Sequence, residues 1–358
     1  MNLTWLRPGQ VGGSEEHLTR LLTGFVDDPD FDLTLYVLES FALAHPELAG
    51  AFRMVVAPVA GTNRLRRVVA EQCWLVSHMN HDEIDVAFHA GGTMPLRPGP
   101  APVLLVHDVQ YLTYPQNFGT VKLTYLRAQV PRSVRRASVV VVPSAYVADR
   151  LAEVFDTDRS KMRVVPHGVG AVSDPAVPFE VERPVILYPA ITYPHKNHVT
   201  LVRAMAEMQH EATLVLTGGE AECEELVMDE VGRLGLTGSV RRLGRVPVEE
   251  LERWWATASV LACPSLYEGF GAPLLEAMVR AVPIVASDAA AIPEVVGDAA
   301  VLVGGTDPSE WAAGLDSVLE GARPELAGLG LKQAENFTPS VAVDRLRDAL
   351  ADAHRRAG

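Results

Sequence analysis

The chain has 358 residues, of which 48% are hydrophobic and 21% are charged. This length exceeds the size at which one hydrophobic core stops growing, and the composition is typical of folded proteins, so we expect two globular domains. The net charge is −14, and it is concentrated in residues 169–358, where 15 Lys and Arg stand against 28 Asp and Glu; residues 1–168 hold 16 against 17. This balance argues against nucleic acid as a partner, because phosphate contacts need a basic surface.

The start of the chain, MNLTWLRPGQ, lacks the charged beginning and apolar centre of a secretion signal. No uncharged apolar run reaches the ~18 residues that cross a bilayer. Cys73, Cys223 and Cys263 lie far apart in the sequence, so they form neither a zinc motif nor a disulfide framework. We therefore expect a cytoplasmic protein.

Residues 1–170 are predicted to form one α/β domain, because short Val- and Leu-rich runs alternate with amphipathic stretches. Continuous apolar runs are typical of strands covered on both faces, as in a parallel sheet. The expected strands are 3–6, 33–38, 54–59, 85–90, 103–108, 139–144 and 163–168. The expected helices are 14–24, 64–77 and 145–155.

The pattern stops at a proline-containing linker, 171–183, and restarts in a second α/β domain over 184–338. Its expected strands are 184–189, 212–219, 240–246, 259–265 and 282–288. Asp307 and Pro308 mark a helix start, and 339–358 is predicted as a terminal helix that can pack back on the first domain. The fold class is thus α/β, with two doubly wound Rossmann-like domains facing each other across a cleft.

Polar residues follow several of the predicted strands. In doubly wound sheets ligands bind beyond the carboxyl ends of the strands, so these positions are candidates for a site. They are His107 with Asp108, Ser144, His167 with Gly168, Gly218 with Gly219, and Glu268.

The stretch PSLYEGFGAPLLEAM, 264–278, follows one of those strands. Gly269 and Gly271 allow close backbone approach, and Pro273 suits the first turn of a helix. Free N–H groups at that helix start favour an anion, and Glu268 and Glu276 could reach different parts of one ligand. A plain capped helix explains the glycines and the proline equally well.

This stretch, followed by PIVASDAAAIPEVVGDAAVLV, resembles the retaining nucleotide-sugar glycosyltransferases of family 4, which have the GT-B fold. Five further segments resemble the same family in the same order along the chain. They are GGSEEHLTRLL (12–22), VHDVQYLTYP (106–115), VVPSAYVADRL (141–151), VVPHGV (164–169) and YPAITYPHKNHVTLVRAM (188–205). The motifs are similar in form to those of mannosyltransferases of polysaccharide and O-antigen biosynthesis.

The resemblance implies catalytic roles for three residues: His107 near the donor sugar, Lys196 on the diphosphate and Glu268 near the transferred sugar. It implies that Glu276 binds the ribose hydroxyls. The implied donor-binding residues are Gly12, Gly13, Gly218, Val246, Phe270, Gly271, Ala272, Pro273, Leu274 and Glu276. Many members carry an arginine shortly before the lysine; this chain has none there, and His195, His198 or Arg245 are the candidates to replace it.

Three other motifs have plainer interpretations. Asp30 and Asp32 form a D-x-D in an acidic turn, which we do not expect to bind metal. The segment SHMNHD, 77–82, is predicted as a surface loop. The arginine-rich run 126–138 is a solvated helix face, or a surface that attracts anionic lipid or a charged acceptor.

The resemblance implies metal-independent transfer of a hexose from a nucleotide diphosphate sugar, GDP-mannose favoured, to a glycan or lipid-linked acceptor with retention of configuration. It implies no other cofactor. The expected location is cytoplasmic, and the arginine-rich run would allow peripheral contact at the inner face of the membrane through the first domain. A nucleotide-sugar epimerase of the same fold and a non-catalytic nucleotide-sugar binding protein are the alternatives.

Overall fold

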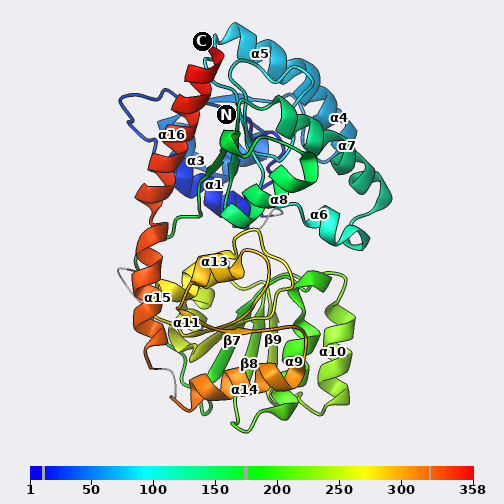
Figure 1. Cartoon of the computed structure of the whole chain (residues 1–358), viewed down its shortest axis with the longest axis vertical. Helices are drawn as coiled ribbons and strands as arrows, with labels where there is room; N and C mark the ends of the chain where they lie inside the picture. Colours follow the sequence, from blue (N-terminus) through cyan, green and yellow to red (C-terminus); the bar gives the residue numbers. More distant parts are fainter. Residues whose placement is uncertain (10–12, 173–175, 322–323) are drawn as a thin grey trace. The chain divides into compact units, whose positions relative to one another are not determined.

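The computed structural model describes residues 1–9, 13–172, 176–321 and 324–358. The chain divides into two compact units (Figure 1). The first unit is Met1–Gly168 with Thr338–Gly358, and the second is Val169–Phe337. The described residues of the predicted linker, 171–183, are therefore counted with the second unit, and the terminal helix with the first.

The first unit is built on a parallel sheet in which the N-terminal segment takes a central place. Asn2 bridges Tyr36 on one side and His89 on the other, which joins two groups of strands into the order β2-β1-Asn2-β3-β4-β5-β6. The strands are β1 (Thr34–Val37), β2 (Arg53–Val56), β3 (Phe88–His89), β4 (Val103–Leu105), β5 (Val139–Val142) and β6 (Met162–Val164). The predicted strand at 3–6 is wrong, because after the single bridge at Asn2 the chain turns, with Leu6 N–H donating to the Leu3 carbonyl.

Alternate side chains of the central strands enter two different cores, as the period of two in a strand requires. Val139 and Val141 pack with α1 (Gly13–Thr23) and α16 (Pro339–Ala357) on one face. Val140 and Val142 pack with residues of α7 (Thr120–Arg136) and α8 (Ala145–Phe155) on the other. Strands covered on both faces explain the unbroken VVVV of β5.

The remaining helices of the first unit surround this sheet. They are α2 (Glu39–Ala44), α3 (Pro46–Ala51), α4 (Arg64–Ala70), α5 (Val76–His81) and α6 (Gln110–Thr113). A π-helical turn, Glu71–Leu75, joins α4 to α5 without a break. The loop predicted at 77–82 is wrong, because α5 buries Met79 against Tyr36 and Leu75 and so continues the helix through His81.

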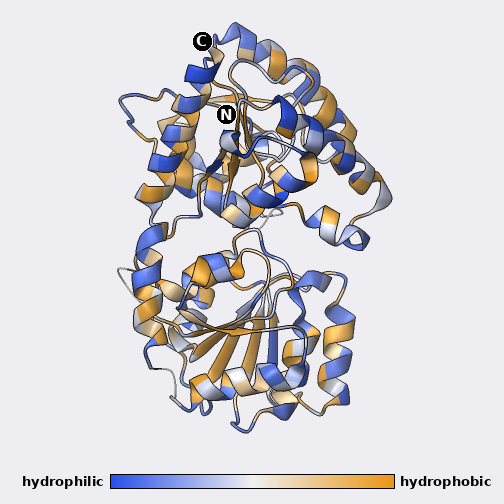
Figure 2. Cartoon of the chain, viewed as in Figure 1, coloured by the Kyte–Doolittle hydropathy of each residue, from blue (hydrophilic) through white to orange (hydrophobic). Residues whose placement is uncertain are grey.

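The second unit has a six-stranded parallel sheet in the order β12-β11-β10-β7-β8-β9. The strands are β7 (Val185–Pro189), β8 (Thr213–Thr217), β9 (Val240–Gly244), β10 (Val260–Cys263), β11 (Ile284–Ser287) and β12 (Ala300–Val303). This is the doubly wound order, so the prediction of two such α/β units is confirmed. Figure 2 shows most of these strands as apolar and the outer helix faces as polar; the edge strand β9 carries Arg241 and Arg242.

Helices cover both faces of the second sheet (Figure 1). One layer holds α9 (His198–Glu207), α10 (Glu224–Arg233) and α14 (Pro308–Leu319), and the other holds α11 (Val248–Thr257), α12 (Ala272–Met278), α13 (Ile292–Val296) and α15 (Leu326–Ala334). Asp307 caps α14 through its side chain, as predicted. No described helix is both long enough and apolar enough to cross a bilayer.

Candidate active site

Two loops meet where the strand order of the second sheet reverses, between β7 and β10. The loop after β7 contains a 3-10 turn, Pro194–Lys196, and the loop after β10 contains Glu268. Leu266 N–H donates to the His195 carbonyl over 2.7 Å and joins the two loops. A reversal of strand order opens a ligand crevice at the carboxyl edge of such a sheet.

Lys196 and Glu268, which we predicted as catalytic, form an ion pair at this edge of the sheet. Nζ of Lys196 donates to Oε1 of Glu268 over 2.5 Å, and the two side chains are 18% and 12% exposed. Burial alone would raise the pKa of Glu268, but the adjacent ammonium outweighs it and holds this pKa below its usual value. Both groups are therefore charged at neutral pH.

Hydrogen bonds from the strand below fix the backbone of both loops. The Tyr188 hydroxyl donates to the Lys196 carbonyl over 2.8 Å and lies 3.0 Å from Oγ of Ser265. The Ser287 hydroxyl donates to the Ser265 carbonyl. Ala291 N–H donates to the Glu268 carbonyl over 3.3 Å. The ion pair is thus held by rigid strand ends.

The glycine turn before α12 has the conformation that its sequence requires. Gly271 has φ +91°, and a Cβ there would lie 2.7 Å from Cδ1 of Leu274. Ala272 and Pro273 begin the helix, which is seven residues long. The side chains of Phe270 and Leu274 belong to the core, so only their backbone groups can serve a ligand. The Leu274 N–H already donates to the Gly271 carbonyl over 2.9 Å.

Glu276 lies on α12 with a half-buried side chain. Its backbone carbonyl accepts a hydrogen bond from Nη1 of Arg280 over 2.9 Å, and Arg280 in turn pairs with Glu252. The structure therefore places Glu276 on the same connection between β10 and β11 as Glu268.

Gly218 and Val246 follow the neighbouring strands β8 and β9. Gly218 has φ +107°, and a Cβ there would lie 2.6 Å from the carbonyl carbon of Ala190, so glycine is needed for the close approach of the two loops. Val246 is half-buried before α11. Both residues lie on the carboxyl edge that carries the ion pair.

Of the three candidates for the missing arginine, the two histidines are neutral at physiological pH. Burial lowers the pKa of His195 to about 4 and that of His198 to about 3. The Arg245 guanidinium lies over Gly219, where a Cβ would be 3.1 Å from its Nε. Arg242, which we did not single out, is held by Glu224 and by the Gly218 carbonyl.

Gly12 lies outside the described residues, and Gly13 is the exposed first residue of α1. Glu15 and Glu16 occupy the first turn of this helix. Oε2 of Glu15 accepts from the N–H of Gly9 over 2.7 Å. These carboxylates already complement the positive end of the helix dipole, which weakens the case for a diphosphate there.

His107, the third predicted catalytic residue, belongs to an aromatic cluster at the carboxyl edge of the first sheet. Its ring centroid is 6.0 Å from that of His17 and 6.4 Å from that of Trp5. The His167 ring stacks on His17 at 4.0 Å with an interplanar angle of 14°. We name Trp5, His17, His107 and His167 the histidine cluster.

The imidazoles of the histidine cluster are neutral at physiological pH. Burial lowers the pKa of His107 to about 4 and that of His167 to about 3. Burial, followed by the neighbouring His167 and His107, holds the pKa of His17 well below its ordinary value. His107 is therefore suited to hydrogen bonding rather than to charge stabilisation.

Sequence reasoning did not single out His17, Trp5 and Tyr188, which lie beside the predicted site residues. A signal existed for His17, because it lies four residues before Leu21 and so shares the buried face of α1. Tyr188 lies in an apolar strand, where a tyrosine is expected to pack in the core.

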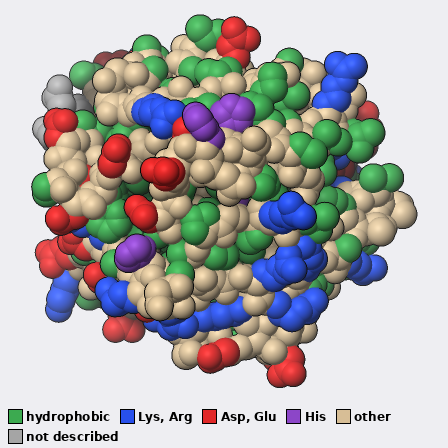
Figure 3. Space-filling model, turned by 90° about the horizontal axis from the view of Figure 1, so that it is seen from above, with side chains coloured by type: hydrophobic (Ala, Val, Ile, Leu, Met, Phe, Trp, Pro, Cys, Tyr) green, Lys and Arg blue, Asp and Glu red, His purple; other side chains and the backbone are tan. Residues whose placement is uncertain are grey.

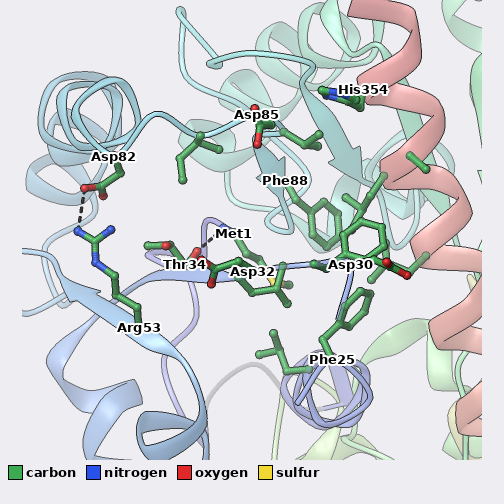
Figure 4. A pocket seen from close by; sticks show the side chains of 18 of the residues that line it. Met1, Phe25, Asp30, Asp32, Thr34, Arg53, Asp82, Asp85, Phe88 and His354 are labelled. Atoms are coloured by element: carbon green, nitrogen blue, oxygen red, sulfur yellow. Dashed lines mark hydrogen bonds and ion pairs between the residues drawn. The ribbon is translucent and has the colours of Figure 1, made fainter. Parts of the chain in front are cut away.

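One cavity lies at the opposite edge of the first sheet, where the strands begin. It has a volume of about 490 Å³ and is lined by apolar side chains and carboxylates. Figure 4 shows the Met1 amine donating to the Thr34 carbonyl, over 2.6 Å, and the ion pair between Arg53 and Asp82. Ligands of such sheets bind at the carboxyl edge, so this cavity is not the expected site.

Asp30 and Asp32, the D-x-D of the sequence, line that cavity. Oδ2 of Asp30 accepts from Nη2 of Arg347 over 2.9 Å, which ties this turn to α16. Among the residues that the structure describes, no group of three or more His, Cys, Asp or Glu could hold a metal ion.

Family models cover most of the chain. Residues 11–171 match the model of glycosyltransferase family 4, and residues 183–321 match that of the glycosyl transferases group 1. The O-antigen chain mannosyltransferase RfbU of Salmonella typhimurium is 27% identical over 215 residues, and O-antigen chain mannosyltransferase B of Escherichia coli is 30% identical over 255 residues. The matches take in 60% and 66% of this chain, and equal shares of those two proteins.

The fold also matches a solved structure. HepE from Anabaena, determined in complex with UDP, superposes with a TM-score of 0.73 at 17% identity, over 96% of this chain and 98% of that chain. At this identity the likeness concerns the fold.

Proposed function

Because the chain belongs to glycosyltransferase family 4 and has the GT-B fold, we propose that it transfers a hexose, with mannose favoured, from a nucleotide diphosphate sugar to a glycan or lipid-linked acceptor. The observation that carries this proposal is the buried ion pair of Lys196 and Glu268 at the reversal of strand order in the second sheet. The relatives that are named as O-antigen mannosyltransferases support the choice of sugar.

The ion pair supplies a cation for a leaving diphosphate. A phosphate oxygen competes with Glu268 for the Lys196 ammonium, and the carboxylate is then available to the hydroxyls of the hexose. Glu276, on the same connection between strands, is assigned to the ribose hydroxyls. Arg245, beside Gly219, is assigned to the second phosphate contact.

The proposed transfer retains the configuration at the anomeric carbon. The bond from that carbon to the phosphate oxygen breaks, and the bond to the acceptor oxygen forms on the same face. The acceptor proton passes to the departing phosphate oxygen, whose charge Lys196 stabilises as it develops. This route needs no carboxylate nucleophile and no metal ion.

A screen of GDP-, UDP-, TDP- and ADP-sugars tests the proposal. We expect one donor to stabilise the chain against thermal unfolding, and to release its nucleoside diphosphate when an acceptor is present. Recovery of an epimerised donor without acceptor would instead support an epimerase. Binding without any turnover would support a non-catalytic sensor.

We also propose peripheral membrane contact through one face of the first unit, made by α4, α7 and the loop between β3 and β4. Helix α7 carries five basic residues and no Asp or Glu, and α4 carries three and none. Leu65, Leu96 and Val121 on this face are 74%, 54% and 85% exposed. Figure 3 shows Lys and Arg side chains gathered along one side of the visible face.

The loop is tied to both helices, so the three segments form one surface. The Leu96 carbonyl accepts from Nη1 of Arg136 over 2.5 Å and from Nη2 of Arg132 over 3.3 Å. The Leu96 N–H donates over 2.7 Å to Gln72, directly after α4. Basic and apolar groups together are typical of surfaces that bind anionic lipid.

Vesicle sedimentation tests this surface. We expect the chain to bind vesicles that contain phosphatidylglycerol and not those of phosphatidylcholine alone. The double variant Leu65→Glu with Val121→Glu should lose this binding, while Leu226→Glu, at an exposed leucine of the second unit, should not. The proposal would be contradicted if the wild type sedimented equally with both kinds of vesicle. It would also be contradicted if the double variant sedimented as the wild type does.

A further inference from the structure

The histidine cluster contains polar atoms that the fold buries without satisfying. Nε1 of Trp5, Nε2 of His17 and Nε2 of His107 are buried, and none has a hydrogen-bond partner among the described residues. His17 as a whole is only 3% exposed. A buried polar atom without a partner loses its hydrogen bonds to water and gains none in the protein. Most buried polar groups in folded proteins are therefore paired.

The three atoms belong to rings that contact one another. The His107 ring stands edge-on to His17 and tilted to Trp5, so the unpaired nitrogens lie in one place rather than scattered through the unit. His167 stacks on His17 and fixes the plane of that ring. A Cβ at Gly91 would lie 2.6 Å from Cδ1 of Trp5, so glycine is needed for the indole to reach this position.

The cluster also lies where the first sheet has its own ligand edge. Trp5 follows the segment of Asn2, Gly91 follows β3, and these two segments are neighbours at the point where the strand order reverses. His107 follows β4 at the same edge. In doubly wound sheets this is the position of the ligand crevice.

We propose that Trp5 and His17 join His107 in a binding subsite for hydroxyl groups of a neutral sugar. The indole can only donate, whereas each imidazole nitrogen can donate or accept. A sugar hydroxyl does both, so it can pair with such a mixed set. The uncharged rings suit a neutral hexose better than a phosphate, and aromatic side chains pack well on the apolar faces of a sugar. This subsite rests on the proposed function, and the sugar is either the hexose of the donor or that of the acceptor.

His89 provides a matched control in the same sheet. It is fully buried, like His17, but both of its ring nitrogens have partners: Nδ1 lies 3.4 Å from Nδ2 of Asn2, and Nε2 lies 2.7 Å from the Pro98 carbonyl oxygen. Phenylalanine in place of either histidine keeps an aromatic ring and removes the nitrogens. If His89 is structural and His17 is functional, the two substitutions have opposite effects.

The experiment compares His17→Phe with His89→Phe by thermal unfolding and calorimetry. We expect His89→Phe to lower the melting temperature, and His17→Phe to leave it unchanged or raise it, because an unpaired buried nitrogen is removed. Trp5→Phe serves as a second variant in case His17→Phe fails to fold. The ligands are GDP-mannose, GDP, UDP-glucose, UDP and, with the nucleotide present, methyl α-mannopyranoside.

The results separate the two sources of the sugar. About tenfold weaker binding of the nucleotide sugar by His17→Phe, with unchanged binding of the nucleoside diphosphate, assigns the subsite to the donor hexose. Unchanged donor binding with loss of the methyl mannoside assigns it to the acceptor. A folded His17→Phe chain that binds every ligand as the wild type does would overturn the subsite. The partners of the ring nitrogens would then be buried water molecules. A wild-type chain that binds no nucleotide sugar would instead overturn the proposed function.

Discussion

The carboxyl edges of the two sheets carry opposite kinds of polar group. In the second unit, Lys196 and Glu268 are charged and paired with each other, and hydrogen bonds from Tyr188 and Ser287 hold their loops. In the first unit, the histidine cluster is uncharged, and three of its ring nitrogens lack a partner among the described residues.

The comparison shows two ways to keep a site ready for a ligand. In a charged pair each group has a partner without ligand, and a ligand enters by exchange of partners. Neutral rings with unpaired nitrogens cost stability without ligand, and a ligand adds bonds that the fold lacks. The second unit therefore suits a charged diphosphate, and the first suits neutral sugar hydroxyls.

The largest effect is expected for Lys196→Ala, which removes the ammonium that pairs with Glu268. We expect kcat to fall by about 10²–10³, the usual loss when a group that stabilises developing charge is removed. The pKa of Glu268 should rise, because burial then acts without the ammonium.

Turnover and circular dichroism of this variant are to be measured together, with Lys196→Arg as the charge-preserving control. Arginine keeps the positive charge but not the compact ammonium, so we expect partial activity. Near-normal turnover by a folded Lys196→Ala chain would remove the ion pair from the mechanism.

The next effect is expected for Glu276→Ala. The carboxylate is assigned to the ribose, so we expect the nucleoside diphosphate to bind about 10–100 times more weakly, with little change in kcat at saturating donor. Calorimetry with GDP and UDP measures this directly. Glu310→Ala, at an exposed position of α14, is the control, and equal affinities for both variants would refute the ribose assignment.

Tyr188→Phe tests whether the loops that carry Lys196 and Glu268 depend on the hydrogen bonds of the Tyr188 hydroxyl. The substitution removes the hydrogen bond to the Lys196 carbonyl and the contact with Ser265, so we expect a loss of about 1–2 kcal/mol in the free energy of unfolding of the second unit. Urea unfolding checks the value. An unchanged midpoint would mean that the loops hold their shape without this tyrosine.

The last effect, which is the smallest for a single residue, concerns pH and separates the two units directly. A histidine whose pKa is lowered by folding binds more protons when unfolded, so stability falls as the pH drops through about 6.5 toward the folded pKa. For each such histidine the loss between pH 8 and pH 6 is about 0.8 kcal/mol. The first unit holds four of these histidines and the second holds two: His17, His89, His107 and His167 against His195 and His198.

Hydrogen exchange of the full chain at pH 8 and pH 6 resolves the units. After correction for the intrinsic exchange rate, we expect protection to fall more in β4 and β5 than in β7 and β8. The His17→Phe chain should lose less protection in the first unit than the wild type. A larger loss in the second unit would contradict the comparison of the two edges.

Most elements were predictable because local sequence and tertiary packing agreed. The Val-rich run of β5 and the cap at Asp307 are examples. Two predictions failed where tertiary contacts decided. The run 3–6 has strand-like residues, but after the Leu3 N–H donates to the Tyr36 carbonyl the chain turns, and Leu3 and Leu6 are buried. Polar residues at 77–82 indicated a loop, yet burial of Met79 extends the helix.

The sequence by itself determined the two parallel-sheet units and placed Lys196, Glu268, Glu276 and His107 after strands, because strand and helix periods are local properties of the chain. Only the tertiary structure decided which of these residues meet. Lys196 and Glu268 are 72 residues apart, and His17 and His167 are 150 apart, so their contacts follow from strand order, which no local pattern encodes. The ion pair with Lys196 keeps Glu268 charged, and burial keeps the histidines neutral; both are likewise properties of the packed units and not of the chain.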